Sequence, residues 1–361
     1  MKNARMNRAR VFACILLTAL AAAGQSAQQI AGGSLLCRDQ IAFMSFFQDE
    51  RPKGISSVLL ASRLARWQSI PALVVCLKPV VAGNAVAVMT SECKRVSAFA
   101  AASGKPLWQR DEWSEILESD GTYFYVEGEN EARVDAIDPL SGAVVWSVYI
   151  PYTGHPLYSF HIHDGRLYTA SVVIDLYERK IIHMWPEKPG VSATAFTEDN
   201  RILTGDGYGM VRTYDRAFSL LKTVHVGSGE IVELGEAGGD ILAATQKRGR
   251  DAYRIELDAV TRDGTRKWQL AWRSHNRLDA VWFVVSGSDV LLLEPEISGN
   301  KFWLTSRKLS SGRLNWKVDA GDDPLELLGP LVLCGNQVYA ANRNEIRSFD
   351  VHTGAETTAR K

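Results

Sequence analysis

The feature that most constrains this 361-residue chain is a recurring pattern in which a glycine turn precedes a tryptophan by four residues. The clearest copy runs from Ala136 to Trp146, and an upstream copy runs from Ala98 to Trp108. Later copies end at Trp268 and Trp316, and the last has Thr358 in the Trp position. Each copy has the pattern of a strand, a tight turn and a second strand that carries the aromatic residue. Such internal repetition predicts a repeat fold.

Weaker copies fill the gaps, so that equivalent positions fall at 67, 108, 146, 183, 223, 268, 316 and 358. A period of about 40 residues is typical of four-stranded propeller blades. We therefore predict an all-β fold, an eight-bladed β-propeller with four antiparallel strands per blade, over residues 34–361. A seven-bladed ring is the alternative, because the first unit and the two units between Trp146 and Trp268 carry the least of the motif. Trp is expected on the outermost strand, where it fills the space between blades and has no chemical role.

The best-conforming unit resembles the tryptophan-docking repeat of the pyrroloquinoline-quinone (PQQ) type propellers. Ala136, Asp138, Gly142 and Trp146 follow its consensus, Ala-x-Asp-x-x-Thr-Gly-x-x-x-Trp. The resemblance covers about residues 34–361. It implies a propeller but does not select a function, since the family includes quinoprotein dehydrogenases and non-enzymatic scaffolds. One such scaffold is the propeller lipoprotein of the bacterial outer-membrane β-barrel assembly machine.

The enzyme hypothesis can be examined on the cysteines and histidines. Resemblance to quinoprotein alcohol dehydrogenases would imply a vicinal Cys-Cys pair and a calcium site. The chain has no adjacent cysteines, no Cys-x-x-Cys-His motif and no Asp-rich calcium loop. His161 and His163 share one strand face and are weak metal candidates, but no third ligand follows by spacing. We predict no cofactor and no enzymatic activity. The alternative is a quinone- or metal-dependent oxidoreductase, or a ligand-binding protein, that uses the central channel.

The N-terminus has the three parts of an export signal. A basic stretch from Lys2 to Arg10 precedes the apolar run Val11–Leu20 and the small residues Ala21–Ala23. We predict a signal peptide over residues 1–24 and a short segment over residues 25–33. An uncleaved membrane anchor is the alternative. The mature protein is then secreted or periplasmic and does not span the membrane.

Export makes disulfides plausible among the four cysteines that follow the signal. Cys76 and Cys93 lie diagonally across a hairpin that turns at Gly83-Asn84, so this bridge is geometrically allowed. Cys37 and Cys334 occupy equivalent first-strand positions in the first and last units. A bridge between them would close the ring, provided that the two inner strands approach closely enough.

The connections divide into two classes that lie on opposite faces of the ring, because strand direction alternates within a blade. The tight-turn face carries turns between first and second strands, at Gly83-Asn84, Asp164-Gly165, Gly238-Gly239 and Gly335-Asn336. The long-loop face carries longer connections, at residues 109–116, 151–157, 246–253, 272–280, 294–301 and 321–330. Function concentrates on variable loops that a rigid scaffold holds.

Arginine and aromatic residues gather on the long-loop face, and this is the residue mix of protein-binding hot spots. Acidic residues between Glu127 and Glu131, and at Asp322 and Asp323, divide the face electrostatically. The 41 basic and 41 acidic residues balance, so we expect no nucleic-acid partner. We predict an exported, non-enzymatic and monomeric scaffold that binds protein partners, in envelope assembly or a related role. The predicted partner-binding residues are Trp113, Tyr152, His155, Arg248, Arg250, Trp272, Arg273 and Arg277, with Lys247 and His275 beside them.

Overall fold

The computed structural model describes residues 79–90, 95–111, 113–128, 133–151, 161–186, 190–274, 281, 283–295, 301–322, 331–341 and 346–357, together with the backbone of four strands before residue 70. These residues form strands and turns and contain no helix. Consequently, no helix in this part of the chain is long and apolar enough to cross a membrane.

The described strands form eight sheets. The first four sheets contain β1 (Cys14–Leu16), β2 (Ile41–Gln48), β3 (Arg51–Leu59) and β4 (Leu64–Ser69); β5 (Val80–Ala82), β6 (Ala85–Thr90), β7 (Arg95–Ala100) and β8 (Pro106–Arg110); β9 (Trp113–Ser119), β10 (Phe124–Gly128), β11 (Arg133–Ile137) and β12 (Val144–Tyr149); and β13 (His161–His163), β14 (Arg166–Tyr168), β15 (Val172–Asp175) and β16 (Lys180–Met184). The others contain β17 (Val191–Phe196), β18 (Ile202–Asp206), β19 (Met210–Tyr214) and β20 (Leu220–His225); β21 (Glu230–Ala237), β22 (Asp240–Arg248), β23 (Tyr253–Thr261) and β24 (Arg266–Ser274); β25 (Phe283–Ser286), β26 (Asp289–Pro295), β27 (Lys301–Lys308) and β28 (Leu314–Asp322); and β29 (Leu331–Cys334), β30 (Gln337–Ala341) and β31 (Ile346–Asp350).

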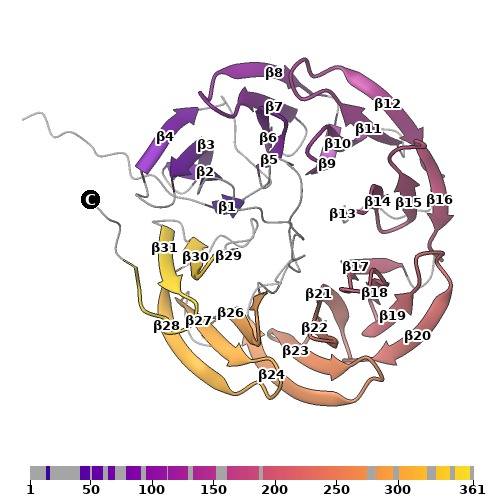
Figure 1. Ribbon diagram of the computed structural model, residues 1–361, viewed down its shortest axis with the longest axis vertical. Coiled ribbons are helices and arrows are strands. Elements are labelled where there is room, and N and C mark those ends of the chain that lie inside the picture. Colours follow the sequence, from indigo (N-terminus) through magenta and orange to yellow (C-terminus); the bar gives the residue numbers. More distant parts are fainter. Residues whose placement is uncertain are drawn as a thin grey trace, which may run out of the picture.

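Neighbouring strands in every sheet are antiparallel and follow chain order, and the sheets stand around a ring with the first strand innermost (Figure 1). A bridge between Phe349 and Glu356 continues the last sheet outward. The predicted all-β propeller is confirmed. Eight sheets agree with the preferred number of blades. The blade count stays a prediction, because the first sheet takes its innermost strand, Cys14–Leu16, from the predicted export signal.

The tight turns adopt the backbone conformations that their sequences predict. Gly83, Gly238 and Gly335 have φ of 53°, 55° and 57°, and Asp164 has φ of 49°. Hairpin turns with these positive φ values favour Gly, Asn and Asp, because other side chains are strained there. The sequence therefore fixes the tight-turn face locally.

Tryptophan docks each conforming sheet onto the next one around the ring. Trp108, on outer strand β8, lies against Gly142, where an added Cβ would be only 2.6 Å from the indole Cδ2. The Trp108 Nε1 donates a hydrogen bond to the Pro139 carbonyl at 2.9 Å. The predicted structural role of these tryptophans is confirmed. The same contacts join Trp268 to Gly312 and Leu309, and Trp316 to Gly354 and Val351.

The sheets without the motif are joined by other side chains. Arg179 and Phe218 take positive φ, 54° and 65°, in the turns where conforming units have glycine. His183, at the Trp position, stacks on Phe218 with a centroid distance of 4.4 Å. Val224 lies at the equivalent interface against Gly264. The repeat is thus degenerate in sequence while the inter-sheet contact persists.

Candidate protein-binding surface

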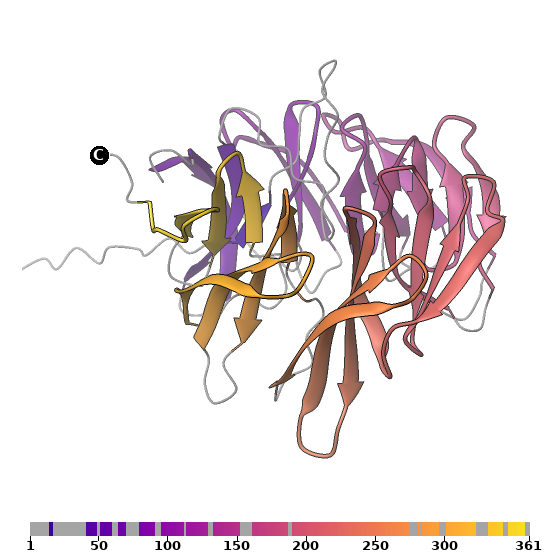
Figure 2. The same ribbon diagram turned by 60° about the horizontal axis from the view of Figure 1, so that its bottom comes forward.

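The sheet of β21 to β24 contains some of the longest strands, and its β22–β23 hairpin projects beyond the neighbouring sheets on the long-loop side (orange, bottom of Figure 2). The hairpin closes with a hydrogen bond from the Gly249 N–H to the Ala252 carbonyl, at 2.8 Å. The sequence predicts a loop over residues 246–253. Instead, regular pairing continues to Arg248 and Tyr253, so only residues 249–252 form the turn.

The strand register places three cations side by side. Lys247 pairs with Arg254, and Arg254 pairs with Arg273 on β24. Paired residues of adjacent strands project from the same sheet face, with strands about 5 Å apart. These three residues therefore form a cationic row across the sheet, and all three are exposed. Arg248, which alternation places on the opposite face of β22, and Arg250, in the turn, are exposed as well. We call these five residues the basic tip.

The other face of the same strands is buried. Ile255 is fully buried, and Trp272 is 8% exposed. Both belong to a core cluster with Phe283 and Leu292 of the next sheet. Trp272 was predicted to contact a partner, but the structure places it in this core, because β24 continues as a strand and alternation turns Trp272 inward while Arg273 faces solvent. Packing thus holds the basic tip on a rigid support.

Most cations of the basic tip have no partner within the described residues. Arg254 donates to Glu256 Oε1 at 2.6 Å, and Glu256 is nearly buried. Lys247, Arg248 and Arg250 make no hydrogen bond or ion pair through their side chains in this part of the chain, and neither does Arg273. Like charges on directly opposed strand positions repel one another. The arrangement therefore costs stability rather than supporting the fold.

A buried carboxyl group lies further along β23. Asp258 is fully buried, and this burial raises its pKa to about 6, although Arg266 acts in the opposite direction. Arg266 Nε lies 2.7 Å from Asp258 Oδ1, and Gln269 contributes a longer contact of 3.4 Å. Asp258 lies in the middle of β23 and is fully buried. It therefore belongs to the interior of the sheet beneath the basic tip and not to the exposed surface.

The structure describes little of the remaining residues that were predicted to bind a partner. Trp113 begins β9, and its side chain is not described. Tyr152, His155 and Arg277, with His275, lie outside the described residues. Their involvement stays a prediction. The same holds for the disulfides, since Cys37, Cys76 and Cys93 lie outside the described residues and Cys334 is described only as the backbone end of β29.

The two histidines proposed as weak metal ligands lie on inner strand β13. His163 stacks on Phe196 of the next sheet at 4.1 Å, and its Nε2 lies 3.2 Å from Asn200 Oδ1. Burial lowers the pKa of His163, and Arg216 and Arg166 act in the same direction against the Asn200 hydrogen bond. Among the described residues, no group of three His, Cys, Asp or Glu could hold a metal ion. The His163 contacts are those of an inter-sheet packing residue.

Sequence reasoning missed Arg254 as a member of the basic tip. The predicted loop over residues 246–253 ends one residue before Arg254 and replaces the strand pairing that places Arg254 beside Lys247. The short turn Gly249-Arg250-Asp251-Ala252 was the available signal. Centring a hairpin on Arg250 and Asp251 pairs Lys247 with Arg254 and places both on one face.

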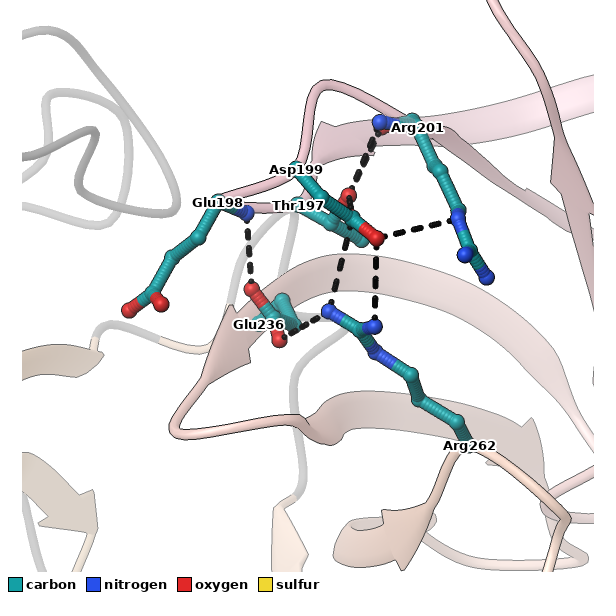
Figure 3. A network of polar contacts seen from close by, with 6 residues as sticks. All are labelled: Thr197, Glu198, Asp199, Arg201, Glu236 and Arg262. Carbon is teal, nitrogen blue, oxygen red and sulfur yellow. Dashed lines mark hydrogen bonds and ion pairs between the residues drawn. The ribbon is translucent and has the colours of Figure 1, made fainter.

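One cluster of charged groups on the tight-turn face is fully paired. Arg262 donates to Glu236 Oε1 at 2.9 Å and contacts both carboxylate oxygens of Asp199 (Figure 3). Arg201 also contacts Asp199, at 3.0 Å, and the Glu198 N–H donates to Glu236 Oε2. Because Asp199 and Glu236 belong to adjacent sheets, this network joins the β17–β20 sheet to the β21–β24 sheet. The cations of this cluster are thus paired, whereas Lys247, Arg248, Arg250 and Arg273 of the basic tip have no partner among the described residues.

Comparison with known proteins identifies the fold family. The family model described as outer membrane protein assembly factor BamB matches residues 92–361. The chain belongs to this BamB family. No curated protein sequence matches the chain.

Solved structures share the same fold at low identity. BamB from Moraxella catarrhalis is 13% identical with a TM-score of 0.63, over 92% of this chain and 99% of that one. Quinohemoprotein alcohol dehydrogenase from Comamonas testosteroni is 10% identical with a TM-score of 0.64, over 90% of this chain and 74% of that one. AztD from Citrobacter koseri is 14% identical with a TM-score of 0.57, over 88% and 94%. These likenesses support the propeller fold, and BamB-family membership leaves the partner open.

Proposed function

We propose that this member of the BamB family is an exported, monomeric and non-enzymatic scaffold that binds protein partners through its long-loop face, in assembly of the bacterial envelope. The observation that carries the proposal is the basic tip. Four of its exposed cations have no partner among the described residues, and they stand on a strand support that is packed against the next sheet. The family description, an outer membrane protein assembly factor, agrees with such a role.

The charge on the basic tip favours binding over a purely structural role. Surface cations that stabilise a fold are paired with acids, as Arg262 is with Glu236. Cations that meet a partner instead remain solvated until binding, and they raise the association rate by electrostatic attraction. Arg is also enriched at protein interfaces, since its planar guanidinium recognises carboxylates through paired hydrogen bonds.

Site-specific photo-crosslinking tests the proposal in the native envelope. A photo-reactive amino acid replaces Arg250 on the basic tip in one variant and Lys105, exposed on the tight-turn side, in a second variant. We expect protein adducts at position 250 and none at position 105. Equal adducts at both positions, or none at position 250, would contradict the assigned face. A quinone absorbance band in the purified protein would contradict the non-enzymatic role.

A further inference from the structure

We propose that the basic tip binds an extended acidic segment of a protein partner, with the row Lys247, Arg254 and Arg273 as the centre of the contact. This inference rests on the proposed function and names the chemistry of the partner. The row crosses three strands in one register, so its three backbone positions are about 5 Å apart. An extended chain places alternate side chains about 7 Å apart on one side, so the long Lys and Arg side chains must adjust to meet them.

The geometry of the row is fixed before binding. Lys247, Arg254 and Arg273 project from strands whose opposite face, at Ile255 and Trp272, lies in the core. A partner therefore orders only side-chain ends and not the backbone, which lowers the entropy cost of association. Repulsion along the row is relieved when carboxylates enter between the cations, so binding releases an unfavourable interaction that the free protein contains.

The composition of the basic tip favours an acidic protein over an anionic membrane. Membrane-surface segments combine Lys and Arg with exposed Trp, Phe or Leu that enter the acyl boundary. Among the described residues, the exposed large hydrophobic side chains fall between Leu140 and Leu221 and at Leu314, and none belongs to residues 240–274. Within the part of the chain that the structure describes, the basic tip therefore has charge without an apolar anchor. Arg at most positions of the tip also fits bidentate recognition of carboxylates.

The acidic residues near the basic tip leave the row available. Asp251 lies in the exposed turn, and Glu256 is engaged by Arg254 below the row. Arg254 is thereby held in position, and its side chain is still 62% exposed. Among the described residues, the row thus keeps a net positive charge that an acidic partner would neutralise.

Binding of a labelled peptide in which glutamate alternates with serine tests the inference on the purified full chain. Fluorescence anisotropy compares the wild type with a tip variant, R248E/R250E/R273E. The matched control is K105E/K222E/R313E, which makes the same charge change at exposed sites away from the basic tip. We expect the tip variant to weaken binding by about tenfold or more and the control by about twofold or less. Added salt should weaken wild-type binding.

A conservative variant separates the loss of charge from a loss of folded structure. R248K/R250K/R273K retains the charge, so binding within about threefold of wild type is expected, with the remaining loss due to the missing guanidinium fork. Equal binding by the tip variant and the control would overturn the inference. The inference would also be overturned if the wild type bound a matched lysine-serine peptide as tightly as the acidic peptide. A third contrary result would be that no acidic peptide binds the wild type, while phosphatidylglycerol vesicles bind the wild type and not the tip variant. If crosslinks at position 250 persist in those cases, the proposed function stands and only the acidic partner is excluded.

Discussion

On the tight-turn face Arg262 lies between Asp199 and Glu236, whereas on the long-loop face Arg248, Arg250 and Arg273 extend into solvent without an acidic partner among the described residues. The first arrangement joins two sheets. The second contributes nothing to that joint and places like charges together. The comparison separates a paired cluster that joins two sheets from solvated cations, which we propose to be a recognition surface. Substitutions on the two faces should therefore differ in kind, with stability lost on one and binding lost on the other.

The largest loss of stability is expected where tryptophan joins neighbouring sheets. Trp268→Ala removes an indole that is 8% exposed, lies against Gly312 and donates to the Leu309 carbonyl. The cavity and the lost hydrogen bond should lower the free energy of unfolding by about 4 kcal/mol. Chemical denaturation measures the change. A loss below about 1 kcal/mol would show that this contact is not a main joint of the ring.

The ion-pair network should show a smaller effect. Arg262→Ala leaves the carboxylate of Glu236, which is 1% exposed, without its cation. The expected loss is about 2–3 kcal/mol, because a buried charge remains unpaired. Denaturation of R262A beside R248A makes the comparison direct, since R248A at the basic tip should change stability by less than about 0.5 kcal/mol. Similar losses for the two variants would remove the distinction between the faces.

The buried carboxyl of Asp258, in the sheet of β21 to β24, predicts that the free energy of unfolding depends on pH. Its folded-state pKa of about 6 is above the ordinary value of 3.8, so the folded protein binds a proton more tightly than the unfolded chain. Stability should therefore fall as pH rises from about 4 to about 6, by about 2 kcal/mol from this group. Asp258→Asn should flatten that slope and raise stability at neutral pH. A slope that is unchanged in the variant would assign the pH dependence to other groups.

The fold could be predicted because its signals are local. Gly142 and Trp146 are four residues apart, and the turn and the docked indole follow from residue types alone. The basic tip could be predicted only in part. Arg248 and Arg273 were recognised, but the length of β22, the position of Arg254 and the burial of Trp272 depend on strand register and on packing against the next sheet. Those are properties of the assembled ring and leave a weaker trace in the sequence.

At the basic tip itself, the smallest effect on stability should accompany a clear effect on binding. The R248E/R250E/R273E variant should unfold within about 0.5 kcal/mol of wild type, because its three side chains contact no described partner, and loss of the Arg273 charge relieves repulsion in the row. Matching denaturation curves for this variant and wild type would verify that the charges are not structural. A marked loss of stability would indicate instead that they support the hairpin.

The division between a structural face and a recognition face is tested most directly by capture of envelope proteins with the purified wild type, the tip variant and the K105E/K222E/R313E control. Quantitative mass spectrometry compares the proteins retained by each. We predict a set of proteins that the wild type and the control retain equally and the tip variant loses. Identical retention by all three, or loss in the control alone, would contradict the account.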